Sequence, residues 1–120
     1  FTMTKLFPTL TLLSQTEQQI SLQLDISADI HWFAGHFPDA PVLPGVTQLD
    51  WAVHYSRQYF PSLQQLQAVE VLKFQQMIRP GHQLVLLLER SAEHTTLFSY
   101  SRNGEKVASG RLKWSLATDA

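Results

Sequence analysis

Apolar and polar residues alternate along several short stretches of the chain, which is typical of β-strands with one buried face. The clearest alternation puts four apolar side chains on one face: Ile20, Leu22, Leu24 and Ile26. The stretch "LTLL" precedes it, across a polar turn at residues 14–18. Together the two stretches predict a pair of short strands, of which the second is half-buried.

The second half of the chain predicts four further strands. Their sequences are "LQAVEVLKF", "LVLLLER", "TTLFSYS" and "KVASGRLKWSLA". The first two are separated by "RPG" at Arg79 to Gly81, and Asn103-Gly104 between the last two is a strong signal for a tight hairpin. In the last stretch one face carries Ala108, Gly110, Leu112, Trp114 and Leu116.

One segment instead predicts a helix, which begins at Gly45 and runs to about Phe60, where Pro61 prevents further helical turns. Fifteen helical residues form a rod about 22 Å long. Residues 27–45 have no regular period, and prolines in this segment push the residues before them toward extended geometry. The segment is therefore predicted to be a rigid loop.

One long helix and five or six mostly hairpin-linked strands predict an α+β fold, in which a curved antiparallel sheet wraps around a single central helix. The 120 residues fit a single domain, residues 1–120. Phe1 and Thr2 precede Met3, so we interpret them as a cloning remnant and Met3 as the native start.

Composition argues against several classes of function. The formal net charge is −1, so nothing favours bulk binding to nucleic acid or to an anionic membrane. The sequence has no cysteine, which removes disulfides, thiolate zinc sites and cysteine nucleophiles. No apolar run reaches the roughly 18 residues of a membrane span and no signal-peptide pattern opens the chain, so the expected location is the cytoplasm.

Candidate chemistry lies in "GHFPDAPVLPGVTQLD", residues 35–50. Asp50 shares a helical stripe with three apolar residues, and we expect this stripe to face the sheet. The three are Val46, Leu49 and Val53. A carboxylate on such a stripe must be hydrogen-bonded, paired or protonated, so Asp50 is either a structural group or part of a site.

Two further residues complete the candidate site. His36 lies in the proline-rich loop, where rigid support suits a general base; the alternative is a solvated or structurally bonded histidine. Gly45 stands at the helix entrance, where unpaired backbone N–H groups favour negative charge and the missing side chain lets a ligand approach. The alternative for Gly45 is that it only makes the turn.

Taken together, these residues resemble the active-site motif of the FabA/FabZ-type 3-hydroxyacyl-(acyl carrier protein) dehydratases, members of the hotdog-fold superfamily. The pattern of that family is a histidine in "HFP", a proline, "PG" at the helix start and an acidic residue fourteen positions after the histidine, and each term is matched here. The matching residues are His36, Pro41, Pro44-Gly45 and Asp50. The later "LKFQQMIRPGHQL" resembles a strand-turn segment of the same family.

The resemblance covers roughly residues 20–116 and implies a long helix enclosed by an antiparallel sheet. It also implies a homodimer or higher homo-oligomer in which each site takes its histidine and its acidic residue from different subunits. The acidic residue is Asp, as in the FabA-type branch, and the helix carries bulky Trp51, His54 and Tyr55 where both branches are rich in alanine. "PGVTQLDWA" looks closer to dehydratase-like proteins encoded with aryl-polyene and related lipid pathways.

The implied reaction converts a 3-hydroxyacyl thioester into a trans-2-enoyl thioester, in fatty-acid or aryl-polyene-type lipid biosynthesis, with no cofactor and no metal. Neutral His36 would remove the C2 proton, Asp50 would protonate the departing hydroxyl, and the Gly45 N–H would stabilise the thioester oxygen. A carboxyl group acts as an acid near neutral pH only where an apolar site raises its pKa. Phe74 is a candidate for lining the acyl channel, with plain core packing as its alternative.

Other features carry less chemistry. Four basic residues are candidates for attracting an acidic acyl carrier protein: Arg57, Lys73, Arg79 and Arg102. Four possible metal ligands have a spacing that matches no familiar site: Asp29, His31, His36 and Asp39. The sequence assigns no role to three further histidines: His54, His82 and His94. Two alternative functions stay open, a hotdog acyl thioesterase and a non-catalytic acyl-binding hotdog subunit.

Overall fold

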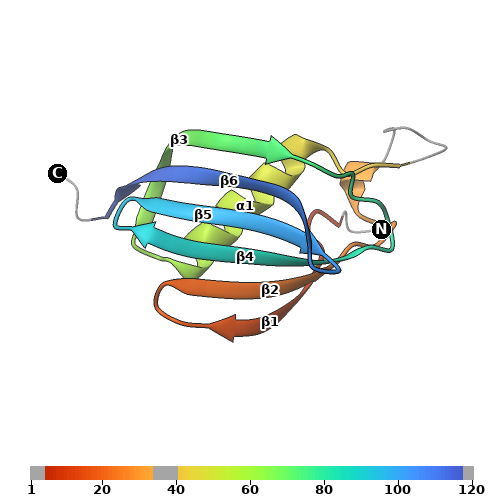
Figure 1. Cartoon of the computed structure of the whole chain (residues 1–120), viewed down its shortest axis with the longest axis horizontal. Helices are drawn as coiled ribbons and strands as arrows, with labels where there is room; N and C mark the ends of the chain where they lie inside the picture. The colour runs from red at the N-terminus through yellow and green to blue at the C-terminus, as the bar shows by residue number, and fades with distance from the viewer. Residues whose placement is uncertain (1–4, 34–40, 118–120) are drawn as a thin grey trace.

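The computed structural model describes residues 5–33 and 41–117, and in these ranges six strands form a single antiparallel sheet beside one long helix (Figure 1). The strands are β1 (Thr9–Gln15), β2 (Gln19–Asp25), β3 (Leu63–Phe74), β4 (Gln83–Ala92), β5 (Thr95–Arg102) and β6 (Glu105–Leu116). The helices are α1 (Gly45–Tyr59) and a single 3₁₀ turn, η1 (His31–Phe33). The strand order is β1-β2-β4-β5-β6-β3, which confirms the predicted α+β architecture.

Most element boundaries agree with the sequence patterns because those patterns are local. Asn103 and Gly104 both have positive φ, 53° and 82°, as the tight turn between β5 and β6 requires. α1 begins at the predicted glycine and ends at Tyr59, one residue before the predicted end. The turn η1 was not predicted, and it lies in the segment that we expected to be loop throughout.

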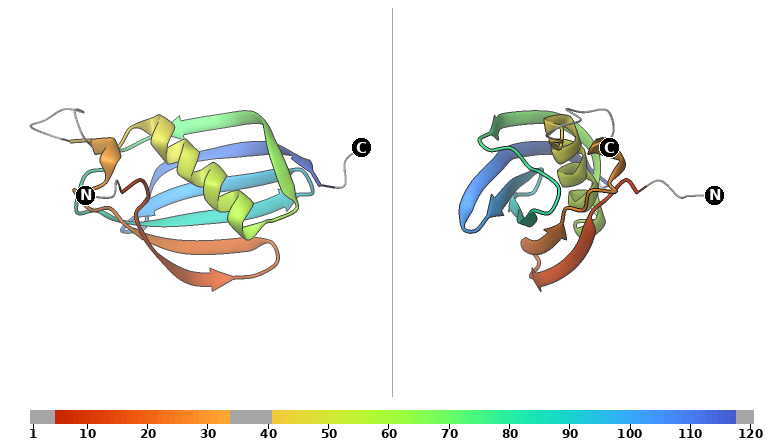
Figure 2. Two further views of the ribbon diagram at one scale, coloured as in Figure 1. Left: turned by 180° about the vertical axis from the view of Figure 1, so that it is seen from behind. Right: turned by 90° about the vertical axis from the view of Figure 1, so that its right-hand side faces the viewer.

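The sheet curls around α1, which crosses its concave face (Figure 2). The predicted inward residues of β2 are all buried, and so is the predicted face of β6. β4 and β5 supply the middle of this core through Leu84, Leu86, Leu88, Phe98 and Tyr100. No helix in the described ranges has the length and apolar character needed to cross a membrane.

The orientation of α1 differs from the prediction. Its buried face consists of Thr47, Gln48, Trp51, Ala52, Tyr55 and Ser56. Leu49 and Val53 are only partly buried at the margin of the core, whereas Val46 is 73% exposed and Asp50 is exposed. The prediction that Asp50 faces the sheet is therefore wrong. Burying the large rings of Trp51 and Tyr55 removes more apolar surface from water than burying two valines.

Gly110 on β6 makes room for an aromatic ring in the core. It pairs across the sheet with Phe98, whose side chain is 1% exposed. A Cβ atom at position 110 would lie 2.5 Å from Phe98 Cε2, closer than two carbon atoms can approach without displacement. The Phe98 ring therefore fills the space that a side chain at Gly110 would need.

Gly110→Ala is expected to lower the free energy of unfolding by about 1–3 kcal/mol, because the new methyl group overpacks the core against the Phe98 ring. Urea denaturation measures the change. Phe98→Leu in the Gly110→Ala background should recover part of the loss, since the shorter side chain leaves room. Ser109→Ala, one residue earlier on the outward face of β6, is the control and should shift stability by less than about 0.5 kcal/mol. An unchanged unfolding midpoint for Gly110→Ala would show that this contact does not constrain the core.

Candidate active site

The segment that leads into α1, residues 41–44, is held by the loop that follows β3. Leu43 is 1% exposed, and its N–H donates a hydrogen bond to the carbonyl of Ile78 over 2.8 Å. The carbonyl of Pro44 accepts the N–H groups of Thr47 and Gln48 at 3.1 and 3.2 Å, which closes the first helical turn. The start of α1 is thereby fixed against the sheet.

The N-terminal segment is bonded both to η1, which precedes residues 34–40, and to α1, which follows them. The indole N–H groups of Trp32 in η1 and Trp51 in α1 both donate to the carbonyl of Leu6, over 2.9 and 3.1 Å. Phe33, the last residue of η1, is buried. The two elements that border residues 34–40 are thus both anchored to the body of the protein.

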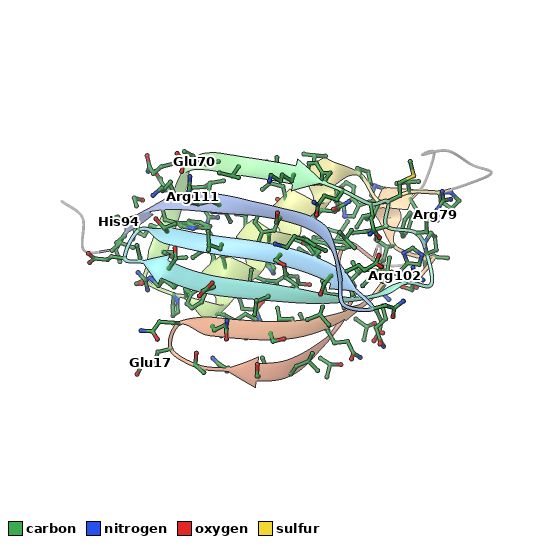
Figure 3. The ribbon with its side chains drawn as sticks, viewed as in Figure 1. Glu17, Glu70, Arg79, His94, Arg102 and Arg111 are labelled. Carbon is green, nitrogen blue, oxygen red and sulfur yellow. The ribbon has the colours of Figure 1, made fainter. Side chains whose placement is uncertain are left out.

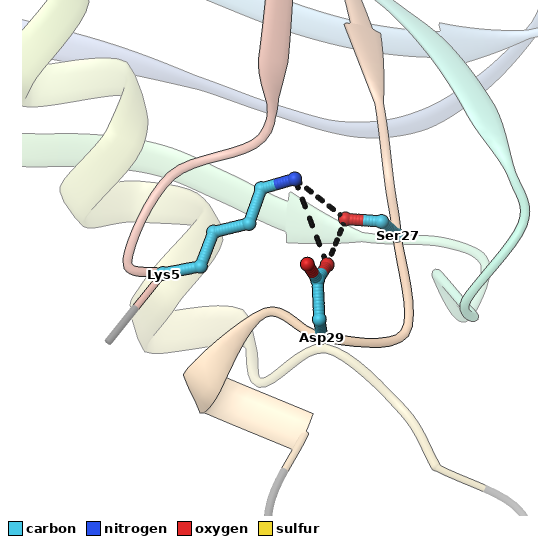
Figure 4. A network of polar contacts seen from close by, with 3 residues as sticks. All are labelled: Lys5, Ser27 and Asp29. Carbon is cyan, nitrogen blue, oxygen red and sulfur yellow. Dashed lines mark hydrogen bonds and ion pairs between the residues drawn. The ribbon is translucent and has the colours of Figure 1, made fainter. Parts of the chain in front are cut away.

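A polar network ties the N-terminal segment to the loop before η1 (Figure 4). Lys5 Nζ lies 2.9 Å from Ser27 Oγ and 3.6 Å from Asp29 Oδ1, and Ser27 Oγ donates to the same Asp29 oxygen over 2.5 Å. The hydrogen bond from Ser27, with the positive charge of Lys5, lowers the pKa of Asp29. Within the described residues, no group of three or more histidine, aspartate or glutamate side chains is arranged to hold a metal ion.

His36 and Asp39 lie outside the described residues, so the role of His36 as a general base stays a prediction. The other three candidate residues lie in described segments.

Gly45 and Phe74 are in direct contact, although they belong to different elements. A Cβ atom at Gly45 would lie 3.0 Å from both Cε2 and Cζ of Phe74, so the phenyl ring covers the first residue of α1. Phe74 is 47% exposed, so its ring is not buried in the core of the described protomer. The ring therefore forms an apolar wall beside the helix start, where the first N–H groups have no carbonyl partner one turn earlier.

Asp50 lies five residues after Gly45, about 7.5 Å farther along the helix axis, and it points away from the sheet. Its side chain lines an open surface hollow of about 410 Å³. The other lining residues are Val53, His54, Arg57 and Gln58. A carboxyl group here is accessible to a ligand.

Sequence reasoning missed the place of His54. It follows Asp50 by four residues, and side chains at this spacing are neighbours on one face of a helix, a signal that was readable in the sequence. The imidazole of His54 packs on the ring of Phe7, with 4.5 Å between ring centroids. His54 is therefore a supported polar group beside Asp50.

The four predicted basic residues do not form one patch. Arg79 and Arg102 lie at the same end of the molecule (Figure 3), and both act electrostatically on His82. Burial, followed by the charges of Arg102 and Arg79, lowers the pKa of His82, and its Nδ1 accepts the N–H of Arg79 over 3.2 Å. Arg57 lies in the last turn of α1, with its guanidinium carbon 5.8 Å from the ring centroid of Trp114. Attraction of a carrier protein stays a prediction.

Comparison with known proteins supports a dehydratase. The model of the ApeI-like family, described as ApeI dehydratase, matches residues 13–111. A curated relative, the 3-hydroxyacyl-(acyl-carrier-protein) dehydratase FabZ of Levilactobacillus brevis, is 29% identical over 101 residues, which cover 76% of this chain and 68% of that protein. The matches span only 43% to 49% of three further curated FabZ proteins.

Solved structures agree with the fold. A chain of the dehydratase heterocomplex ApeI:P of Xenorhabdus doucetiae is 30% identical, with a TM-score of 0.81, and the match covers 89% of this chain and 96% of that one. Thioesterase superfamily member 2 of Mus musculus has a TM-score of 0.67 over 88% of this chain and 80% of its own, but at 11% identity it shows the fold alone. The expected hotdog fold is confirmed, and the chain belongs to the ApeI-like family of hotdog-fold dehydratases.

Proposed function

We propose that this protein dehydrates a 3-hydroxyacyl thioester, carried on an acyl carrier protein, to a trans-2-enoyl thioester. The observation that carries the proposal is the position of Asp50, exposed in a hollow on α1 in a chain that matches a dehydratase family over residues 13–111. The names of the curated relatives specify 3-hydroxyacyl groups on acyl carrier protein. We place the reaction in fatty-acid or aryl-polyene-type lipid biosynthesis, in the cytoplasm and without a cofactor.

Each candidate residue has a distinct role in this reaction. Neutral His36 accepts the proton from C2, and the electrons of that C–H bond form the new double bond as the C3–O bond breaks. Asp50 donates a proton to the departing hydroxyl, which leaves as water. The N–H of Gly45 stabilises the negative charge that develops on the thioester oxygen, and one such donor contributes about 3–4 kcal/mol. Phe74 borders the acyl chain at the helix start.

An unpaired sheet edge and exposed apolar side chains support a site completed by a second copy of the chain. β3 is the last strand in the sheet order, so within the described protomer one of its edges pairs with no strand. Exposed apolar side chains lie at the end of β3, in the segment that follows it and at the start of α1: Leu72, Phe74, Met77 and Val46. A copy bound there would remove these apolar side chains from contact with water.

We propose that this second copy brings His36 of one subunit to Asp50 of the other, in a homodimer or a larger homo-oligomer. A related hotdog subunit is the alternative occupant, because the Xenorhabdus doucetiae structure is described as a heterocomplex. The fold shared with a thioesterase does not favour thioester hydrolysis, because that similarity is confined to the fold.

His36→Ala and Asp50→Asn should each lower kcat by about 10²- to 10⁴-fold, the usual contribution of a general base or acid. The assay supplies 3-hydroxyacyl thioesters of several chain lengths and follows enoyl thioester formation by absorbance and loss of water by mass spectrometry. His94→Ala and Glu17→Gln are the controls, since both residues lie in turns at the opposite end of the sheet from Arg79 and Arg102 (Figure 3).

Other outcomes of this assay would identify the alternative functions. Free acid and thiol would identify a thioesterase, and unchanged substrate with measurable binding would identify a non-catalytic acyl-binding subunit. If His36→Ala and Asp50→Asn both turn over as fast as the parent protein, the assignment of the site is wrong.

A further inference from the structure

A series of three hydrogen bonds links the middle of the sheet to the segment before α1. The hydroxyl of Tyr100, on β5, donates to the main-chain carbonyl of Gln48 over 2.6 Å. The side-chain Nε2 of Gln48 donates to the carbonyl of Leu43 over 3.1 Å. The N–H of Leu43 donates to the carbonyl of Ile78 over 2.8 Å. All four residues are at most 3% exposed, so water does not compete for these bonds.

The series acts on a part of the chain that has no regular structure of its own. Residues 41–44 belong to neither helix nor strand, so no ladder of backbone bonds defines their position. Leu43 uses both of its backbone groups in this series, and it stands two residues before Gly45. A shift of Leu43 would therefore be transmitted directly to the N–H that begins α1.

The stability of the fold alone does not account for a glutamine at the buried position 48. Its Oε1 atom is buried and has no hydrogen-bond partner among the described residues. A buried acceptor without a partner costs about 1–3 kcal/mol, and a methionine of similar length would avoid that cost. The amide of Gln48 therefore costs more free energy than an apolar side chain of similar size would, which points to a role in holding Leu43.

We propose that Gln48 and Tyr100 are positioning residues, which together fix Leu43 and thereby hold the Gly45 N–H where it meets the thioester oxygen. The proposal rests on the proposed dehydratase function. Neither side chain touches substrate, since Gln48 is 3% exposed and Tyr100 is fully buried. Burial, with smaller effects of Tyr55 and Asp50, raises the pKa of Tyr100 well above its usual value, so its hydroxyl keeps the proton that it donates.

Gln48→Met and Tyr100→Phe are expected to lower kcat by about 10- to 100-fold, because a displacement of a catalytic group by about 1 Å has an effect of this size. KM should change by less than about twofold, since the substrate contacts remain. Tyr55→Phe is the matched control: Tyr55 is also a buried tyrosine, and its hydroxyl makes no hydrogen bond to another described residue. It should retain the kcat of the parent.

The Gln48→Met, Tyr100→Phe double variant tests whether the two residues act through the same link. Its kcat should be close to that of the more damaged single variant, because the second change removes a bond that no longer positions anything. If the two losses multiply, the residues act independently and the proposed series is wrong.

Hydrogen exchange at the amide of Leu43 separates this proposal from the proposed function. Exchange should become at least about tenfold faster in Gln48→Met and Tyr100→Phe, because local opening is easier, and should stay unchanged in Tyr55→Phe. If the Leu43 amide exchanges faster in these two variants but the parent protein dehydrates no thioester, the positioning of Leu43 is supported and the proposed reaction is wrong. Parental exchange in both variants, or parental kcat in both, would overturn the positioning role.

Discussion

Trp51, Ala52 and Tyr55 bury one face of α1 against the concave side of the sheet, and this contact decides which helical side chains remain accessible. Fully burying a large apolar side chain contributes about 1.5–3 kcal/mol. Turning the helix so that Asp50 faced the sheet would lose the burial of these rings and would also desolvate a carboxylate. The acidic group is therefore directed outward because the aromatic residues beside it are directed inward.

This orientation explains why the candidate site is open in a single protomer. Gly45 and Phe74 are in contact where the end of β3 meets the start of α1, and Asp50 lies farther along α1 in a hollow lined by residues of the helix itself. The apolar side chains of Phe74 and Val46 on this side remain 47% and 73% exposed. In the proposed dimer a second subunit covers them, so burial of this surface and completion of the site would depend on the same contact.

Local patterns predicted the parts of the fold that depend on nearest neighbours. The alternation in β2 and β6, the Asn103-Gly104 turn and the start of α1 were all readable, because each follows from residues within a few positions. The buried face of α1 was not readable. Polar Thr47, Gln48 and Ser56 interrupt its apolar pattern. The hydrogen bond from the Tyr100 hydroxyl to the main-chain carbonyl of Gln48 joins residues 52 positions apart, so no local pattern indicates it.

The candidate site was likewise only partly predictable from the sequence. The residues Gly45 and Asp50 followed from the motif, whereas the contact between Gly45 and Phe74 depends on how β3 packs beside α1. His54 was missed although its spacing from Asp50 was visible, because Asp50 was predicted to face the sheet, whereas both residues line a hollow on the outer face of α1. The strained backbone of Val71, with φ of 51°, and the bulge around it likewise have no signal in the sequence.

The most direct test of a site shared between subunits is to mix two inactive variants. His36→Ala and Asp50→Asn subunits are unfolded together and refolded in equal amounts, and enoyl formation is compared with that of each variant refolded alone. In a random mixture of dimers about a quarter of the sites would combine an intact histidine with an intact aspartate, so the account predicts recovery of about a quarter of the parental rate. Activity of the mixture that stays at the level of the separate variants would contradict a site built from His36 and Asp50 of different copies.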